Sequence, residues 1–261
     1  DFIDEVVKKG AAAVLINEKS FKKIKNYEIP VITVKDTTTA LGDAARLWRS
    51  KLKTKIIGIT GSAGKTTTKE ILAVLLSEKL KVNKTIANNN NHIGVPLTIL
   101  STNEKHNALV AELGTNHFGE LAYTASIVSP DFALITNIGD SHLEFLKNRK
   151  GVFTEKSALL KETIKRGGKV FINNDDKILK DFGKTIKNKI TYALNEKADY
   201  KASIKGYDKL ARPQIEIKSK DKSFKSTLPI SGEKNVINFT AAYAIASELG
   251  LSNTQMQKAV K

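Results

Sequence analysis

The residues of this chain best suited to chemistry form one short run, and their types point to phosphate binding. The run reads Thr60-Gly61-Ser62-Ala63-Gly64-Lys65-Thr66-Thr67. Glycines in such a loop let backbone N–H groups turn toward an anion, and Lys65 adds a positive charge. The hydroxyl of Thr66 is the kind of group that holds Mg²⁺ beside a nucleotide phosphate. The run therefore predicts chemistry with ATP or GTP.

The run departs from the usual phosphate-loop pattern at one position. That pattern has a glycine five residues before Gly64, where this chain has Ile59, and Gly58 comes one residue too early. A plain glycine turn between a strand and a helix is therefore the alternative. The flanking sequence favours the phosphate loop, because an apolar strand precedes it and an amphipathic helix follows it.

Three further side chains could take part in the chemistry. Glu112 ends an apolar strand, His142 follows the next strand, and Lys156 lies on the helix after that. A carboxylate at a buried strand end is costly unless it is paired or bound to a metal, so Glu112 is a candidate Mg²⁺ ligand. Each residue also has an alternative without chemistry. Glu112 could be a helix cap or form a salt bridge, His142 could be a structural histidine, and Lys156 could be one of many surface lysines.

These residues need a sheet to bring them together, and the sequence predicts one. Strands and helices alternate after the phosphate loop, with strands expected at 107–113, 132–138 and 169–173 and helices at 119–128 and 150–166. Continuous apolar strands of this kind indicate a mostly parallel sheet covered by helices on both faces. Ligands of such α/β sheets bind at the carboxyl ends of the strands.

The two ends of the chain have different patterns. Residues 1–53 are expected to form a small α/β unit, and residues 54–261 a second domain, with a lysine-rich connector between them. Polar and apolar residues alternate over 190–230, which predicts antiparallel strands appended to the main sheet. The last element expected is a helix that ends near Gly250, followed by a short segment, 251–261.

Composition excludes several classes of protein. The 261 residues contain no cysteine and no apolar stretch long enough for a membrane span, so we expect no disulfide, no thiolate metal site and no membrane insertion. The formal net charge of +16 favours anionic partners. No basic cluster is interleaved with aromatic residues, so we expect no nucleic-acid binding. Without a signal peptide in its first residues, the protein is expected in the cytoplasm.

Four segments of the chain resemble the Mur ligase family in order and spacing. They are residues 58–70, 88–98, 111–120 and 137–144. Segments 88–98 and 111–120 are most similar to the family member that uses D-alanyl-D-alanine. Thr-Gly-Ser-x-Gly-Lys-Thr is the family's own form of the phosphate loop. In that form Ile59, in place of the usual glycine, no longer argues against ATP binding. The resemblance implies a central ATP-binding domain at 54–261 and a partial UDP-substrate-binding domain at 1–53.

The resemblance also implies roles for individual residues. Lys65 would contact the β- and γ-phosphates of ATP, and Asn238 would lie at the adenine. Thr66 and Glu112 would hold one Mg²⁺. His142 would bind a second Mg²⁺, together with Lys156, which many family members carry as a carbamate. The nucleotide loop implied by the resemblance comprises Thr60, Gly61, Ser62, Ala63, Gly64, Lys65, Thr66 and Thr67.

The implied reaction joins D-alanyl-D-alanine to UDP-N-acetylmuramoyl-tripeptide through an acyl phosphate, with ATP and Mg²⁺, in a monomer that makes peptidoglycan precursors. Met256 is the only methionine and no initiator is present, so we expect a fragment. The resemblance implies that this fragment lacks the family's third domain and the beginning of its first domain, and that it is inactive alone. Alternatives are another Mur-type or folylpolyglutamate-type amide ligase, a phosphate-loop phosphotransferase, and a basic nucleic-acid-binding protein.

Overall fold

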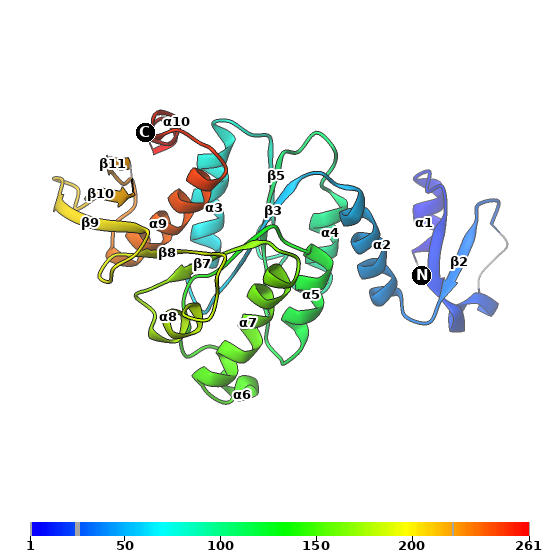
Figure 1. The fold of residues 1–261 in the computed structure, drawn as a ribbon. Helices are drawn as coiled ribbons and strands as arrows, with labels where there is room; N and C mark the ends of the chain where they lie inside the picture. Colours follow the sequence, from blue (N-terminus) through cyan, green and yellow to red (C-terminus); the bar gives the residue numbers. More distant parts are fainter. Residues whose placement is uncertain (1, 24–26, 221, 261) are drawn as a thin grey trace.

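The computed structural model describes residues 2–23, 27–220 and 222–260, and it contains two separate sheets (Figure 1). Asp1 and Lys261, which bound the two predicted domains, lie outside the described residues. Nine strands form the large sheet and two form the small one. Helices lie on both faces of the large sheet, as the alternation of elements predicts.

The small sheet belongs to the first 34 residues. It pairs β1 (Val14–Asn17) with β2 (Val31–Val34) in parallel, next to α1 (Ile3–Lys8) and a 3₁₀ turn (Glu18–Lys23). Figure 1 shows this unit at one side of the molecule, joined to the rest through α2. The two strands and α1 agree with the small α/β unit that the sequence predicts in this region, whereas the 3₁₀ turn was not expected.

Helix α2 (Thr37–Lys51) packs on the large unit. Asp36 caps it by accepting a hydrogen bond from the Thr39 N–H at 2.5 Å. Ala45 on α2 is fully buried in an apolar cluster of the large unit. Arg49 donates from Nε to the Val128 carbonyl and from Nη2 to the Ser129 carbonyl, each at 2.9 Å. Helix α2 is therefore fixed to the large unit by packing and by partly buried hydrogen bonds.

The large sheet has the order β11-β10-β9-β8-β7-β6-β3-β5-β4, and every pair from β9 to β4 is parallel. Its central strands are apolar runs buried on both faces. The strands are β3 (Lys55–Thr60), β4 (Val82–Lys84), β5 (Ala108–Glu112), β6 (Phe132–Ile135), β7 (Lys169–Asn173), β8 (Lys189–Ala193), β9 (Tyr200–Tyr207), β10 (Pro213–Ser219) and β11 (Lys222–Thr227).

The predicted fold class, a mostly parallel sheet with appended antiparallel strands, is confirmed, but the antiparallel region is shorter than expected. Within the part of the chain that the structure describes, only the pairs of β10 with β9 and β11 are antiparallel. Strand β8 is parallel to β7 because α8 (Lys177–Gly183), which the sequence reading missed, carries the chain back between them.

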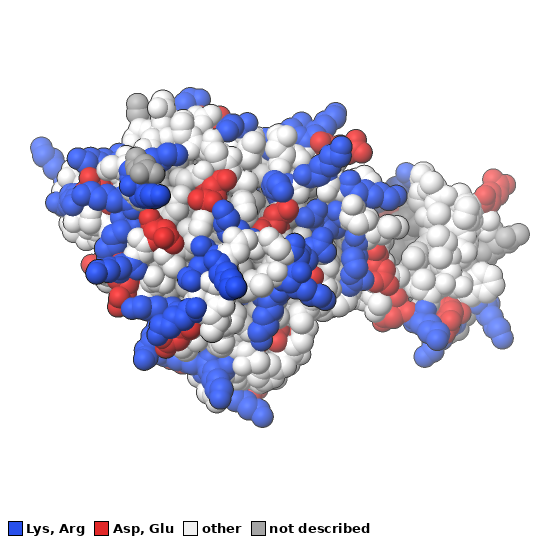
Figure 2. All heavy atoms as spheres, in the orientation of Figure 1, with Lys and Arg blue, Asp and Glu red and all other residues white. Residues whose placement is uncertain are grey.

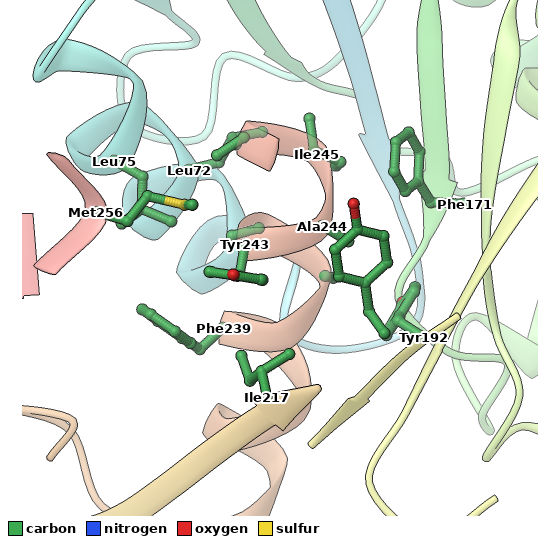
Figure 3. Packing of buried hydrophobic residues seen from close by; sticks show 14 of the residues in the cluster. Leu72, Leu75, Phe171, Tyr192, Ile217, Phe239, Tyr243, Ala244, Ile245 and Met256 are labelled. Atoms are coloured by element: carbon green, nitrogen blue, oxygen red, sulfur yellow. The ribbon is translucent and has the colours of Figure 1, made fainter. Parts of the chain in front are cut away.

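One face of the sheet is covered by α3 (Lys65–Ser77), α9 (Glu233–Glu248) and α10 (Asn253–Val260). Helix α10 replaces the short segment expected at 251–261. Its polar sequence offers only Met256 and Val260 as buried residues. Figure 3 shows Met256 close to Leu72 and Leu75 of α3. Met256 and Val260 are four residues apart and share a helix face, but so short a segment gives sequence reasoning only one such spacing to detect.

The opposite face carries α4 (Gly94–Leu100), α5 (Glu120–Val128), α6 (Leu143–Leu146) and α7 (Arg149–Lys165). Asn148 caps α7 by accepting from the Gly151 N–H at 3.0 Å. Figure 2 shows lysines and arginines spread over the visible surface among carboxylates, rather than gathered in one stripe. Among the described residues, no helix is both long and apolar enough to cross a membrane.

Candidate active site

The phosphate-type loop lies at the carboxyl edge of the large sheet, between β3 and α3. Two of its glycines have backbone angles that favour glycine, with φ of +150° at Gly61 and +79° at Gly64. A Cβ on Gly61 would lie 1.9 Å from Thr136 Oγ1, so space also demands glycine there. The sequence therefore has glycine where both conformation and packing require it.

The end of β6 supports this loop. The Asn137 side chain accepts from the Ala63 N–H at 3.1 Å and donates to the Ala63 carbonyl at 2.9 Å. The Gly139 N–H donates to Ser62 Oγ at 2.9 Å, and the Ser62 and Ser141 hydroxyls lie 3.0 Å apart. The residues after β6 therefore lie against the loop, as expected for neighbouring strand ends of one sheet.

Lys65 points back into the loop. Its Nζ donates to the Gly61 carbonyl at 3.0 Å. Burial lowers the pKa of Lys65, and the nearby Glu112 carboxylate opposes that shift. The ammonium group is thus held at the mouth of the loop, where a phosphate would replace its bond to the carbonyl oxygen.

Glu112 is a buried carboxylate with three kinds of partner. The Thr66 hydroxyl lies 3.2 Å from Oε1 and 3.0 Å from Oε2. Asn90 Nδ2 donates to Oε1 at 2.9 Å, and Lys69 Nζ lies 3.5 Å from Oε2. Glu112 therefore forms a salt bridge, with Lys69, which was the alternative to metal binding. It also contacts the hydroxyl of Thr66, which was expected to bind the metal together with it.

The pair of Glu112 and Thr66 fits a magnesium ion. Carboxylate and hydroxyl oxygens are hard ligands, and the two side chains already touch. Among the described residues, no three His, Cys, Asp or Glu side chains gather into a metal cluster. Metal binding here would therefore need oxygens from a bound nucleotide as well, which is usual for Mg²⁺.

A cavity of about 360 Å³ lies beside the loop and collects three predicted residues. Lys65, His142 and Lys156 line it, with the side chains of the asparagine segment, Asn88, Asn90 and Asn91. Notably, His142 has a left-handed backbone conformation, with φ of +52°. Asn90 contacts both this cavity and Glu112. The four residues expected to be catalytic are therefore neighbours around the loop.

Lys156 is the most perturbed cation in this cavity. Only 1% of the residue is exposed. Burial is the main reason that its pKa falls to about 8, with Lys65 adding to the shift and Glu155 opposing it. Burial also lowers the pKa of His142, and the charges of Lys156 and Lys65 contribute. These mutual effects place the three groups in one electrostatic environment.

A second cavity, of about 430 Å³, opens on the other side of the loop. Gly64, Thr67, Lys234 and Asn238 line it together with the ends of β6 and β7. A Cβ on Gly64 would lie 2.7 Å from Asn238 Oδ1, so helix α9 closely approaches the loop. The structure brings Asn238 to the phosphate loop, although the two are far apart in sequence.

Sequence reasoning gave no role to two buried side chains near the site. Lys69 is fully buried three residues after Thr66 on the same helix. Glu155 accepts from Thr115 Oγ1 at 3.0 Å and from the Gly119 and Leu121 N–H groups at 2.8 and 2.7 Å. The spacing of Lys69 from Lys65 and Thr66 was the available signal, because residues three and four apart share a helix face.

Comparisons with known proteins agree with one another. The model of the Mur ligase middle domain matches residues 59–246. A UDP-N-acetylmuramoyl-tripeptide–D-alanyl-D-alanine ligase from Haemophilus influenzae is 35% identical over 266 residues, which cover 98% of this chain and 55% of that relative. The ligase of the same name from Bacillus subtilis is 33% identical, covering 96% of this chain and 53% of the relative.

Solved structures give the same result. A crystal structure of MurF from Acinetobacter baumannii superposes with a TM-score of 0.86 at 32% identity, covering 99% of this chain and 56% of that one. MurF from Thermotoga maritima, in complex with ADP, gives 0.84 at 29% identity, covering 98% and 59%. The chain spans about half the length of the curated relatives it matches.

Proposed function

The chain belongs to the Mur ligase family, and on that basis we propose that it is the nucleotide-binding part of a UDP-N-acetylmuramoyl-tripeptide–D-alanyl-D-alanine ligase, MurF. The observation that carries the proposal is the contact of Thr66 with Glu112 next to a cavity lined by Lys65, His142 and Lys156. The names and titles of its relatives supply the substrates, the tripeptide nucleotide and D-alanyl-D-alanine.

The proposed reaction has two chemical steps. In the first, the terminal carboxylate of the tripeptide attacks the γ-phosphorus of ATP, an O–P bond forms, and the bond to the β-phosphate oxygen breaks to release ADP. Two anions must approach each other in this step, and the Lys65 ammonium offsets part of their repulsion. In the second step the amine of the dipeptide attacks the acyl carbon, phosphate leaves, and the surplus proton of the amine passes to solvent.

Thr66 and Glu112 would hold the Mg²⁺ that accompanies ATP, and His142 and Lys156 a second one. Bound Mg²⁺ neutralises charge on the phosphates and on the group in transfer. An amine with a pKa near 8 is partly neutral at physiological pH. Neutral Lys156 can add to CO₂ and release a proton, which leaves a carbamate in place of the cation. A carbamate oxygen suits Mg²⁺, which an ammonium group repels.

The remaining assignments complete the proposal. Asn238 contacts the adenine region, and residues 60–67 surround the phosphates. We propose a boundary at 53/54 between a substrate-binding domain and the ATP-binding domain, and a monomer that works in the cytoplasm, where its substrate ATP is made. Helix α2 lies on the amino-terminal side of that boundary, although it packs on α4 and α5.

Phosphate release from ATP tests the proposal. We would measure it for this chain and for the full-length protein, with UDP-N-acetylmuramoyl-tripeptide and with or without D-alanyl-D-alanine. Release by the full-length protein should need both substrates and should be lost in Lys65→Met. Release that ignores the dipeptide would favour a phosphotransferase, and release that depends on glutamate would favour a folylpolyglutamate-type ligase.

A further inference from the structure

Lys69 is a buried cation that the proposed reaction does not use. Its side chain is 0% exposed, although it lies on α3 one turn after Lys65. Lysine is almost never fully buried without a partner, because removing an ammonium group from water is costly. The contacts of Lys69 must therefore explain why a lysine is present at this position.

Lys69 has two anionic neighbours, and they differ in environment. Glu70 Oε1 lies 3.2 Å from Nζ, but the Glu70 side chain is 45% exposed and also pairs with Lys84. Glu112 Oε2 lies 3.5 Å from Nζ, and the Glu112 side chain is 2% exposed. Attraction between charges is strongest where water is excluded, so the main electrostatic partner of Lys69 is Glu112.

Lys69 also fixes the loop that carries the asparagine segment. Its Nζ donates to the Ala87 carbonyl at 3.2 Å. Ala87 has φ of +49°, a left-handed conformation that is unfavourable for alanine. From the same loop, Asn90 donates to Oε1 of Glu112. Asn90 thus contacts Oε1 of Glu112 and Lys69 pairs with Oε2, while the Thr66 hydroxyl lies near both oxygens.

We propose that Lys69 is a positioning residue for the ligase reaction, and that its buried ammonium group fixes the Glu112 carboxylate in the orientation in which Glu112 and Thr66 together present oxygens to the magnesium of bound ATP. This inference rests on the proposed function. Lys69 acts through Glu112 and need not touch ATP. Without Lys69, the carboxylate keeps Thr66 and Asn90 but loses the buried cation that pairs with Oε2.

The test compares nucleotide binding with and without magnesium. Isothermal titration calorimetry would give the dissociation constant of ATP in excess Mg²⁺ and in EDTA for the unmodified chain, Lys69→Met and Lys69→Gln. The ratio of the two constants reports the magnesium-dependent gain. Loss of the buried cation that pairs with Glu112 should reduce that gain about tenfold or more. Lys161→Met, which removes an exposed lysine on α7, should leave the ratio unchanged.

Folding is checked separately by circular dichroism and thermal unfolding. If Lys69→Met does not fold, Lys69→Gln provides the reading, because it keeps a polar group at the site without the charge. A structural role alone would lower the unfolding temperature and leave the magnesium-dependent ratio at its wild-type value, and that result would overturn the inference. If the unmodified chain shows no magnesium-dependent gain, the proposed function fails and the inference with it.

Discussion

Gly64 and Asn238 are in such close contact that no side chain fits between them, since a Cβ on Gly64 would lie 2.7 Å from Asn238 Oδ1. Gly64 also has φ of +79° and forms the amino-terminal cap of α3. One contact therefore joins the phosphate loop to helix α9. It brings the loop and an asparagine more than 170 positions later in the sequence into the lining of one cavity.

Gly64→Ala should weaken nucleotide binding. Alanine at this backbone angle costs on the order of 1–2 kcal/mol, and the clash with Asn238 adds to that cost. We expect at least a tenfold loss of ATP affinity by calorimetry, roughly 1.4 kcal/mol. Gly119→Ala is the matched control, because Gly119 also caps a helix with positive φ but has nothing within 4 Å of the added Cβ. Equal losses of affinity in both variants would contradict this account.

His142 should titrate below its ordinary pKa of 6.5, because of burial and of the positive charges of Lys156 and Lys65. Lys156→Met should therefore raise the pKa of His142, since it removes the larger of the two charge effects. Proton–nitrogen NMR of the imidazole gives the titration midpoint directly. Lys161→Met should not move the midpoint. An unchanged midpoint in Lys156→Met would show that the two groups are not electrically coupled.

Lys156 should make stability depend on pH in alkaline buffer. Its pKa is about 8 when folded and 10.5 as the reference value, so the unfolded chain binds more protons between these two pH values. The cost of burying the charged amine is present below pH 8 and disappears as pH rises toward 10.5. As the pH rises from below 8 to about 10.5, the free energy of unfolding of the unmodified chain should therefore increase relative to that of Lys156→Met, by on the order of 3 kcal/mol.

Urea unfolding at several pH values between 7 and 10 would measure this difference. Buffers free of CO₂ keep the amine uncarbamylated. The difference in free energy of unfolding between the unmodified chain and the control Lys161→Met should not change with pH over this range. If the difference in free energy of unfolding between the unmodified chain and Lys156→Met is also independent of pH, the buried amine retains its ordinary pKa.

Glu155 should contribute to stability rather than to chemistry. Its carboxylate accepts from Thr115 and from two backbone N–H groups at the start of α5. Glu155→Gln removes the charge from these bonds and puts a donor where one acceptor stood, so it should cost about 2 kcal/mol or more. Urea unfolding measures the loss. Glu144→Gln, at an exposed position on α6, should change stability by less than about 0.5 kcal/mol.

The sequence predicts the central part of this molecule because local and global patterns agree there. Strands β3 and β5 are apolar runs that end at Thr60 and Glu112, and parallel strands bring their ends to one edge. That geometry was enough to place Glu112 beside the phosphate loop. The same rule placed the segment after β6, whose Asn137 contacts the loop.

Contacts between distant parts of the chain could not be predicted in this way. A lysine in an amphipathic helix usually points to solvent, and the burial of Lys69 depends on Glu112 and Ala87, which other segments provide. Helices α8 and α10 have only seven and eight residues, so each shows its apolar spacing over about two turns, too short a stretch for the pattern to identify a helix. The contact of Asn238 with Gly64 was expected only from family resemblance.

The attachment of α2 decides where the polypeptide can be shortened. A version beginning at residue 54 would lose Arg49, leave the Val128 and Ser129 carbonyls without its hydrogen bonds, and expose the apolar surface that Ala45 covers. Freshly exposed apolar surface promotes aggregation. A version beginning at Asp36 would keep the helix and its cap. Truncation before α2 should therefore yield protein that stays in solution without aggregating, whereas truncation after α2 should yield protein that precipitates.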